Sequence, residues 1–249
     1  MNPTNIIYGV HPVAEAVKSG VSIDKILVNK SLKGEGFQML RELCKQHNIY
    51  LNRVPEEKIR RIVRKGNHQG VVAFVSPVEF HSIREILPSL YEQGKTPFVI
   101  VLDRVTDIRN FGAVIRTAEC FGVDAIVIPQ KGAASVNEDV VKTSAGAIFN
   151  IPLCKEKSLV NTVKFMKDCG LEIYSATEKA TASCYEQTLQ TPCALVMGSE
   201  GEGISEDILR LSDKQLKIPI AGNTGSFNVS VAAGILMYEI VRQSAVKKH

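Results

Sequence analysis

The stretch that decides the fold reads Ala194-Leu195-Val196-Met197-Gly198-Ser199-Glu200-Gly201-Glu202-Gly203-Ile204-Ser205. It begins as a continuous apolar run, which is the pattern of a parallel strand buried on both faces. The run opens directly into a glycine-rich turn, and a helix pattern follows. Backbone amides in such a turn can receive a ligand, although a plain surface turn with Ser205 capping the next helix has the same pattern. The stretch therefore predicts an α/β sheet with a candidate binding turn at one strand end.

Outward from this stretch, apolar runs alternate with amphipathic ones across residues 97–249. The pattern predicts strands at Phe98–Leu102, Ala125–Ile128, Leu171–Ala176, Ala194–Met197 and Leu216–Ile220, and helices from about Ile108, near Asp139 and over Phe227–Val241. The last helix is apolar nearly all the way round, which favours burial in the core or in a subunit interface. These residues are expected to form one mainly parallel-sheet domain.

A second, smaller α/β unit is predicted over residues 1–76, where short apolar runs again alternate with amphipathic ones. Residues 77–96 hold Pro77, Pro88 and Gly94 around one short amphipathic stretch, Ile83–Tyr91. Proline and glycine in that density are typical of a domain linker. The expected organisation is a domain at 1–76, a linker at 77–96 and a larger domain at 97–249.

The composition is that of a folded globular protein, with 45% hydrophobic and 22% charged residues among 249. No apolar run approaches the roughly 20 residues needed to cross a bilayer, and the start lacks the pattern of a secretion signal. We therefore expect a cytoplasmic protein without a membrane segment. The net charge of +4 is only weak evidence for a polyanionic partner.

The cysteines and histidines give no sign of a metal site. Six cysteines are scattered without a C-x-x-C pair, so we expect them to be reduced, without disulfides or zinc. His11 and His68 lack the partner four residues away that zinc-binding helices carry.

A polar segment follows the strand Phe98–Leu102 and leads into the helix that begins near Ile108. In that helix Arg109 and Arg116 are seven residues apart, so they share a direction away from the apolar face and could bind a phosphodiester. The alternative is that Arg116 pairs only with Glu119 or with solvent. Asn110 suits a helix cap, and Gly112 would allow a backbone or ligand to approach closely.

The central glycine turn matches neither the Rossmann nor the Walker pattern, because its glycines run G-x-x-G-x-G and no G-K-[ST] follows. Glu200 and Glu202 would repel phosphate and favour a ligand with hydroxyls, an amine or a sulfonium. A third polar turn lies at Ala221–Asn228, again before a helix. Turns at the carboxyl ends of parallel strands converge on one crevice, so one shared site is expected.

Three motifs taken in order resemble those of the SpoU/TrmH family within the SPOUT methyltransferase superfamily: Asn110–Arg116, Gly198–Gly203 and Ser226–Ala232. Tyr8–Ala16 and Asn67–Ala73 are similar to members that methylate a guanosine ribose in large-subunit ribosomal RNA. The resemblance covers nearly the whole chain. Phe227 departs from it, since leucine is common at that position, and we expect only the packing beside the cofactor to change.

The resemblance implies a small N-terminal α/β RNA-binding domain, a C-terminal SPOUT domain with a trefoil knot, S-adenosylmethionine as cofactor, and a homodimer. The cofactor would contact Thr177, Gly198, Glu200, Ile218, Ile220, Phe227 and Asn228. The catalytic residues would be Arg116, Asn110, Glu200, Ser226 and Asn228, with Arg116 supplied across the dimer. A guanidinium is normally protonated, so we expect Arg116 to stabilise a developing alkoxide rather than act as a base.

Basic residues cluster on Glu56–Gly66, with Arg61, Arg64 and Lys65 at helical spacing. They could contact an RNA backbone or could form the solvated side of an amphipathic helix, and the residues alone favour neither. With the resemblance, the expected RNA contacts are His11, Arg61, Arg64, Lys65, His68 and Arg109.

The predicted activity is methyl transfer to the ribose 2′-hydroxyl of a guanosine in large-subunit ribosomal RNA. Three alternatives stay open: a transfer RNA 2′-O-methyltransferase, a non-catalytic RNA-binding or ribosome-assembly factor, and an enzyme that uses the glycine turns for another nucleotide cofactor. The intact motif residues oppose the assembly factor, and the missing nucleotide fingerprints oppose the last.

Overall fold

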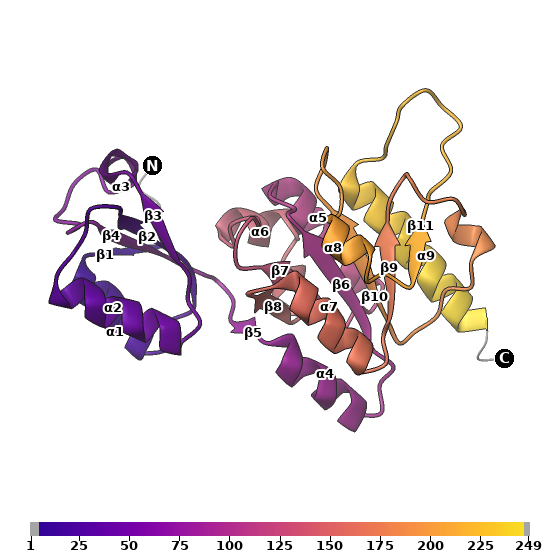
Figure 1. Cartoon of the computed structure of the whole chain (residues 1–249), viewed down its shortest axis with the longest axis horizontal. Coiled ribbons are helices and arrows are strands. Elements are labelled where there is room, and N and C mark those ends of the chain that lie inside the picture. The colour runs from indigo at the N-terminus through magenta and orange to yellow at the C-terminus, as the bar shows by residue number, and fades with distance from the viewer. Residues whose placement is uncertain (1–4, 247–249) are drawn as a thin grey trace. The chain divides into compact units, whose positions relative to one another are not determined.

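The computed structural model describes residues 5–246, so residues 1–4 and 247–249 lie outside the described part. Figure 1 labels the helices and strands along the chain. The chain divides into two compact units, Met1–Glu79 and Phe80–His249, called here the N-terminal and the C-terminal unit.

The N-terminal unit is a four-stranded sheet with helices on both faces. Its elements are β1 (Ile6–Tyr8), α1 (Val10–Lys18), β2 (Ile23–Asn29), α2 (Glu35–Gln46), β3 (Leu51–Val54), α3 (Glu56–Ile62) and β4 (Val71–Val75). The strand order is β1-β4-β2-β3, with β4 antiparallel to both neighbours and β2 parallel to β3. One core packs α1 and α2 on the sheet, and a smaller one packs Ile59 and Val63, at the end of α3, on Leu27 and Val72.

The C-terminal unit is built on a seven-stranded, wholly parallel sheet. Its elements are β5 (Phe80–His81), α4 (Ile83–Glu92), β6 (Phe98–Asp103), α5 (Ile108–Cys120), β7 (Ala125–Pro129), α6 (Glu138–Thr143), η1 (Ala147–Phe149), β8 (Leu153–Glu156), α7 (Leu159–Asp168), β9 (Glu172–Ala176), η2 (Cys184–Glu186), β10 (Cys193–Gly198), α8 (Glu206–Leu209), β11 (Lys214–Leu216) and α9 (Val229–Val246). The strand order is β11-β9-β10-β6-β7-β8-β5.

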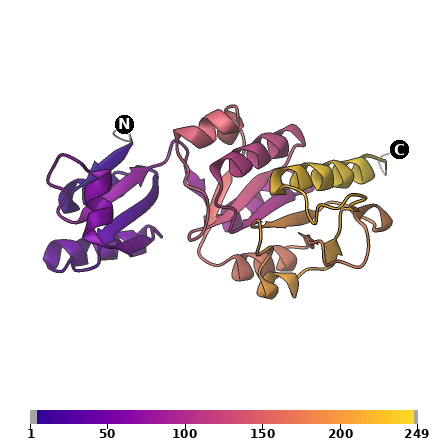
Figure 2. The same cartoon turned by 90° about the horizontal axis from the view of Figure 1, so that it is seen from above.

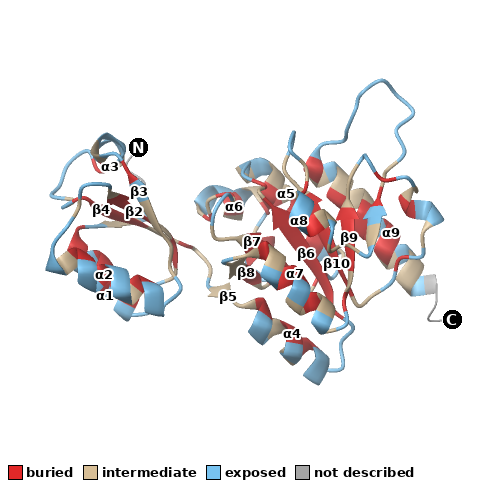
Figure 3. Ribbon diagram, in the orientation of Figure 1, coloured by how far each residue is buried: buried red, intermediate tan, exposed pale blue. Residues whose placement is uncertain are grey.

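Helices cover both faces of this sheet, as its continuously apolar strands require. The helices α4, α7 and α8 pack on one face around a core that includes Val99, Val127 and Val196. On the other face α5 packs against both α6 and α9, and Figure 2 shows α9, in yellow, running beside α5. The central strands β6 and β10 are buried almost throughout, as their red ribbons in Figure 3 show.

The linker expected at 77–96 is wrong over most of its length. Strand β5 pairs with β8 at the sheet edge, and α4 buries Ile83 and Leu87 in the core of the C-terminal unit. Pro88 lies inside α4, where its ring would ordinarily break a helix. Burial of the apolar side chains spaced four apart outweighs that cost, so only the residues around Glu79 connect the two units.

Other elements differ from the sequence prediction in their ends. The predicted strand Leu216–Ile220 lies instead at Lys214–Leu216, and the final helix begins at Val229 rather than Phe227. The helix α3 ends at Ile62, so Arg64 and Lys65 lie beyond it and their expected helical spacing with Arg61 is wrong. The short strand β8 and the helix α7 were not predicted.

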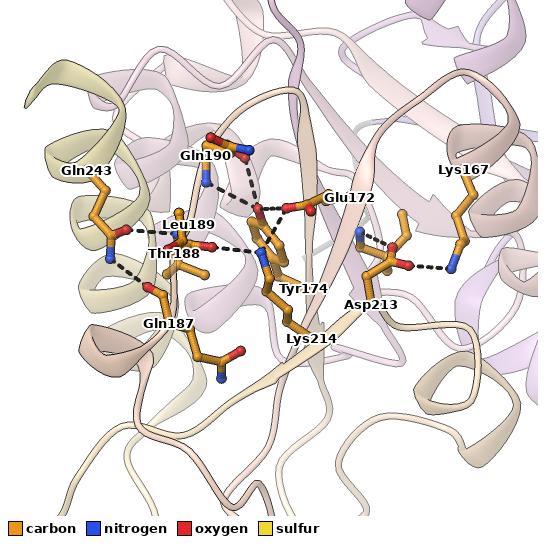
Figure 4. Close-up of polar contacts among 11 residues, drawn as sticks. Lys167, Glu172, Tyr174, Gln187, Thr188, Leu189, Gln190, Asp213, Lys214 and Gln243 are labelled. Atoms are coloured by element: carbon orange, nitrogen blue, oxygen red, sulfur yellow. Dashed lines mark hydrogen bonds and ion pairs between the residues drawn. The ribbon is translucent and has the colours of Figure 1, made fainter. Parts of the chain in front are cut away.

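A polar network fixes the amino-terminal ends of β9 and β11, as Figure 4 shows. Lys214 Nζ donates to Glu172 Oε2 at 3.0 Å and to the Thr188 carbonyl at 2.7 Å, while the Tyr174 hydroxyl donates to Glu172. Gln243, on α9, receives a hydrogen bond from the Leu189 amide at 2.8 Å. The segment between β9 and β10 is thereby tied to two strands and to the last helix.

Among residues 5–246 no helix is long and apolar enough to cross a membrane. Within the same range, no three His, Cys, Asp or Glu side chains gather as a metal site would require. The six cysteines are all free thiols, and burial raises the pKa of Cys44 to about 11 and, as the largest cause, that of Cys154 to about 12.

Candidate active site

The sheet of the C-terminal unit has one place where ligands usually bind in such folds. The chain leaves β6 through α5 toward β7 on one side, and leaves β10 through α8 toward β11 on the other. The neighbouring strands β6 and β10 therefore flank a switch point, where their two outgoing connections diverge and open a crevice. The candidate site is built at the carboxyl ends of these two strands, from the Asp103 and Gly198 pair outward.

The last residue of β6 and the residue after it hold the turn that follows β10. Asp103 is buried, and its Oδ2 accepts from the Ser205 amide at 2.7 Å. Arg104 bonds Asp103 Oδ1 at 3.2 Å, the Gly203 carbonyl at 3.1 Å and the Glu202 carboxylate. Its backbone has φ +60°, which costs an arginine about 1–3 kcal/mol. Such strain persists only where the surroundings determine the conformation, as these contacts do here.

Close backbone packing shapes the turn Gly198–Gly203. Ser199 and Gly203 exchange two backbone hydrogen bonds, of 3.3 and 3.0 Å, which fold the turn back on the strand end. A Cβ at Gly198 would lie 2.2 Å from the Gly203 carbonyl carbon and 2.3 Å from the Ile204 nitrogen. Only glycine fits there, so the sequence signal at this position reports a tight backbone crossing.

Three predicted site residues meet above this turn. Glu200 Oε1 accepts from Asn110 Nδ2 at 3.0 Å and from Asn228 Nδ2 at 2.9 Å. Asn228 Nδ2 also donates to Asn110 Oδ1 at 2.9 Å, and Asn228 Oδ1 accepts from the Ser230 amide at 3.0 Å. The cluster joins the start of α5, the central turn and the start of α9. It holds one exposed carboxylate in a fixed position at the crevice.

The remaining predicted cofactor residues lie on the neighbouring strand ends and on one exposed loop. Thr177 follows β9, and its amide donates to the Leu216 carbonyl at 3.0 Å, beside the end of β11. Ile218 follows two residues later and is half-buried. Residues 219–228 are exposed throughout, and Ile220 and Phe227 leave 37% and 40% of their surface in solvent. Ser226 lies on this loop and makes no hydrogen bond to another described residue.

Arg116 stands apart from the cluster. It lies six residues beyond Asn110 on α5, about 120° away around the helix, so the two side chains point to different sides. It is exposed and has no ion pair within the described residues, Glu119 included, and Arg109 is exposed in the same direction. A single chain therefore does not bring Arg116 to Glu200.

The predicted RNA contacts of the N-terminal unit are solvent-accessible. His11 is exposed at the start of α1, Arg61 is exposed at the end of α3, and Arg64 and Lys65 are exposed in the loop that follows. His68 is half-buried, and its Nδ1 accepts from the Gly70 amide at 2.9 Å.

The structure differs from the sequence prediction at two residues of α5 and at the end of β6. Asp107, not Asn110, caps the helix, since its Oδ1 accepts from the Asn110 amide at 2.9 Å. Gly112 makes room for α6 and not for a ligand, because a Cβ there would lie 2.0 Å from Thr143 Oγ1. Asp103 and Arg104 were not singled out, although an aspartate that ends an apolar strand is itself a signal of a buried hydrogen-bonding role.

Comparisons with known proteins cover both units. Residues 97–238 match the SpoU rRNA Methylase family, and residues 6–81 match the RNA 2′-O ribose methyltransferase substrate binding family. A Staphylococcus saprophyticus protein named for the TrmH family of tRNA/rRNA methyltransferases is 34% identical over 238 residues, which cover 96% of this chain and 95% of that protein.

Two solved structures share the fold over nearly the whole chain. A protein of Porphyromonas gingivalis, described as a TrmH-family RNA methyltransferase, superposes with a TM-score of 0.58 at 27% identity, covering 96% of this chain and 90% of its own. The SpoU methyltransferase AviRb from Streptomyces viridochromogenes, solved with its cofactor AdoMet, gives a TM-score of 0.59 at 24% identity, covering 96% and 89%.

Proposed function

Because the chain belongs to the SpoU rRNA methylase family, we propose that it methylates the ribose 2′-hydroxyl of a guanosine in large-subunit ribosomal RNA. The family matches show that the chain is an RNA methyltransferase of the SpoU/TrmH kind. The observation that carries the proposal is the Asn110–Glu200–Asn228 cluster at the switch point of the sheet. The cytoplasmic location expected from the sequence remains a prediction.

S-adenosylmethionine (AdoMet) is the proposed cofactor, and it would supply a methyl group carried on a sulfonium. The residues present suit that molecule. Glu200 offers a fixed carboxylate that favours positive charge and accepts from hydroxyl or amine donors. Ile220 and Phe227 offer exposed apolar surface, and the turn at Gly198 offers backbone groups. Thr177, Ile218 and Asn228 would complete the set, with Ser226 close to the reacting groups.

A ribose 2′-hydroxyl is a poor nucleophile, so the chain must orient it and stabilise the charge that grows on its oxygen. Orientation alone can lower a barrier by about 7 kcal/mol. The guanidinium of an arginine stays protonated at neutral pH, so Arg116 would stabilise a developing alkoxide and would not remove the proton. Asn110 and Asn228 act earlier, by holding Glu200 in place.

A homodimer is part of the proposal, because the single chain leaves Arg116 away from Glu200. The surface around α5 and α9 also exposes apolar side chains: Val231 is 50% exposed, Tyr238 56% and Phe149 59%. Val231 and Tyr238 are seven residues apart on α9 and share a face, and the ring of Phe121 lies 6.4 Å from that of Tyr238. A second copy covering this surface would bring its own Arg116 to the boundary between subunits.

The test is transfer of radiolabelled methyl from AdoMet to large-subunit ribosomal RNA and to transfer RNA, followed by nucleoside digestion. The expected product is 2′-O-methylguanosine in the ribosomal RNA. Arg116→Ala should lower turnover about 100-fold or more while sparing cofactor binding. Arg41→Ala, which removes an exposed arginine of α2, is the control.

Each other outcome has a definite meaning. Label only in transfer RNA would mean that transfer RNA is the substrate and that the reaction is the one proposed. Cofactor binding without label in either RNA would favour an assembly factor. Unchanged turnover in Arg116→Ala would remove that residue from the mechanism.

A further inference from the structure

The N-terminal unit contains an open pocket of about 640 Å³ at the carboxyl end of β2. Its wall is formed by Asn29 and the loop that follows it, by one side of α3, and by the loop Gly66–Gly70 before β4. Backbone bonds brace these segments, since the Asn29 amide donates to the Gly70 carbonyl at 2.8 Å and the Val71 amide to the His68 carbonyl at 2.8 Å. The volume lies in the range of small-molecule sites, roughly 300–1,000 Å³.

Several polar groups in this pocket have hydrogen-bonding capacity left over. Asn67 and Lys33 line it, are exposed, and make no hydrogen bond to another described residue. His68 accepts at Nδ1 from the Gly70 amide, which leaves Nε2 to donate to a ligand. Gln69 uses its Oε1 to accept from the Val10 amide at 3.2 Å and keeps its two amide protons. These groups match the edge of a nucleobase better than an apolar ligand.

An aromatic ring stands next to the pocket. Tyr8 is 38% exposed, and its ring packs so closely on Gly66 that a Cβ there would lie 2.7–2.9 Å from three of its atoms. Gly66 itself lines the pocket. An exposed ring beside free amide groups is the arrangement on which proteins stack unpaired bases.

The charge around the pocket favours a polyanion. Residues 1–79 contain twelve Lys and Arg against seven Asp and Glu, a net charge of +5, while the whole chain carries +4. All of the excess positive charge therefore lies in the N-terminal unit. In the pocket Arg60 pairs with Glu56 at 2.6 Å, whereas Lys33 has no partner of its own.

We propose that this pocket binds one unpaired nucleotide of the RNA substrate, distinct from the nucleotide that is methylated. Asn67, His68 and Gln69 contact the edge of the base, Tyr8 stacks on it, and Lys33 binds the adjoining phosphate. The proposal rests on the proposed function, because it assumes an RNA substrate.

A loop or bulge, and not a helix, is the part of RNA that fits. In paired RNA the base edges face a deep, narrow major groove or a shallow minor groove, so a base cannot enter a pocket while it stays paired. An unpaired base can leave its stack and present its hydrogen-bonding edge. The N-terminal unit would thus select substrates that offer an unpaired nucleotide.

Binding of two labelled RNAs to the full chain, without AdoMet, tests this. One is a hairpin pool with randomised loop positions, and the other is a fully paired duplex of the same stem. The wild type should bind the hairpin pool about 10-fold more tightly than the duplex. Asn67→Ala combined with His68→Asn, which keeps an acceptor for the Gly70 amide, should bring the two affinities together. Affinity for the duplex should stay unchanged.

Two matched pairs separate stacking and charge. Tyr8→Ala should weaken hairpin binding about 10-fold, whereas Tyr8→Phe keeps the ring and should bind as the wild type does. Lys33→Ala should lower the slope of log affinity against log salt by about 0.7, the value for one phosphate of a single strand. Lys45→Ala removes an exposed lysine at the far end of α2 and should leave the slope unchanged.

The proposal is overturned if the wild type binds hairpin and duplex equally, or if the pocket variants weaken both equally. Methyl transfer is measured separately, with Arg116→Ala as the variant that should lower turnover. Loop-specific binding without methyl transfer would end the proposed function and keep the pocket. If the wild type transfers methyl groups and the pocket variants change neither binding nor product position, the pocket proposal falls and the proposed function stands.

Discussion

Glu200 accepts hydrogen bonds from two side-chain amides, so its charge and its hydrogen bonding can be separated by substitution. Glu200→Gln keeps an oxygen that Asn110 and Asn228 can use and removes only the negative charge. If the carboxylate attracts the sulfonium, AdoMet should bind about 5-fold more weakly, equal to about 1 kcal/mol. The demethylated product, whose sulfur is neutral, should bind nearly as it does to the wild type.

Calorimetric titration of both ligands measures this difference, with Glu206→Gln on α8 as the control for loss of an exposed carboxylate. An equal loss for both ligands would mean that Glu200 acts through its hydrogen bonds alone.

Gly198 offers a steric prediction at the same scale. Gly198→Ala places a methyl group 2.2 Å from backbone, so the turn must open, and AdoMet binding should be lost together with some thermal stability. Gly225→Ala adds the same methyl group where nothing lies within 4 Å and should leave both unchanged. Thermal melting with and without AdoMet checks both variants. If AdoMet raises the melting temperature of Gly198→Ala as much as that of the wild type, the turn does not need its close backbone crossing.

The resemblance to the SpoU/TrmH motifs indicated the cluster residues, and the structure brings Asn110, Glu200 and Asn228 together. The sequence could not indicate which neighbour caps α5, because aspartate and asparagine are both good caps and only the backbone path selects Asp107. Gly112 is needed because α6 packs against it, and α6 comes after the next strand along the chain, β7. Roles set by distant segments leave little trace in a local pattern.

At the scale of elements, the network on β9 and β11 makes stability depend on pH. Burial alone would raise the pKa of Asp213, but hydrogen bonds from Lys167 and the Ile173 amide outweigh it, and the net shift is downward. A lowered pKa adds stability above the unfolded value, about 3.9, which is lost as the pH falls through the folded value. The wild type should therefore lose stability below about pH 4.

Asp213→Asn removes that titration while leaving an oxygen for one of the two donors. Urea midpoints at several pH values should then fall less steeply in acid than in the wild type. Asp168→Asn, at an exposed aspartate that ends α7, should keep the wild-type slope. Equal slopes in all three proteins would show that the Lys167–Asp213 contact does not carry the dependence.

The elements found from sequence were those with long apolar runs, such as β6, β7 and β10. The strand β8 has only four residues, two of them charged, and β5 has only two, so neither gives a clear pattern. The density of proline and glycine at Pro77, Pro88 and Gly94 indicates a linker, yet α4 forms there because Ile83, Leu87 and Leu90 bury one side of it. Tertiary packing decided these cases, and local propensity did not.

At the scale of the whole molecule, the proposed dimer gives a direct test. Tyr238→Glu puts a charge into the exposed apolar surface of α9. If the proposed dimer supplies Arg116 from the other subunit, this change should yield monomers that bind AdoMet but transfer no methyl group. Light scattering with chromatography measures the mass. Met39→Glu, at an exposed methionine of α2, should leave mass and activity unchanged. An active monomer would contradict the proposed sharing of the site.

The general architecture was predictable because strands buried on both faces and helices between them permit few arrangements. The order of the strands was not, since β10 lies beside β6 although three strands, β7, β8 and β9, come between them along the chain. The trefoil knot implied by the family resemblance depends on threading and not on strand order, and it stays a prediction.

The pairing of β6 with β10 also determines which unit can fold first during translation. Phe98 lies opposite Cys193, so the middle of the large sheet cannot form until nearly two hundred residues have left the ribosome. The four strands of the N-terminal unit are complete by Val75 and need nothing from later sequence. The N-terminal unit of a growing chain would therefore be folded while the C-terminal unit is still unfolded. Because a long loop must close before β6 and β10 can pair, the folding of the C-terminal unit should be the slow step.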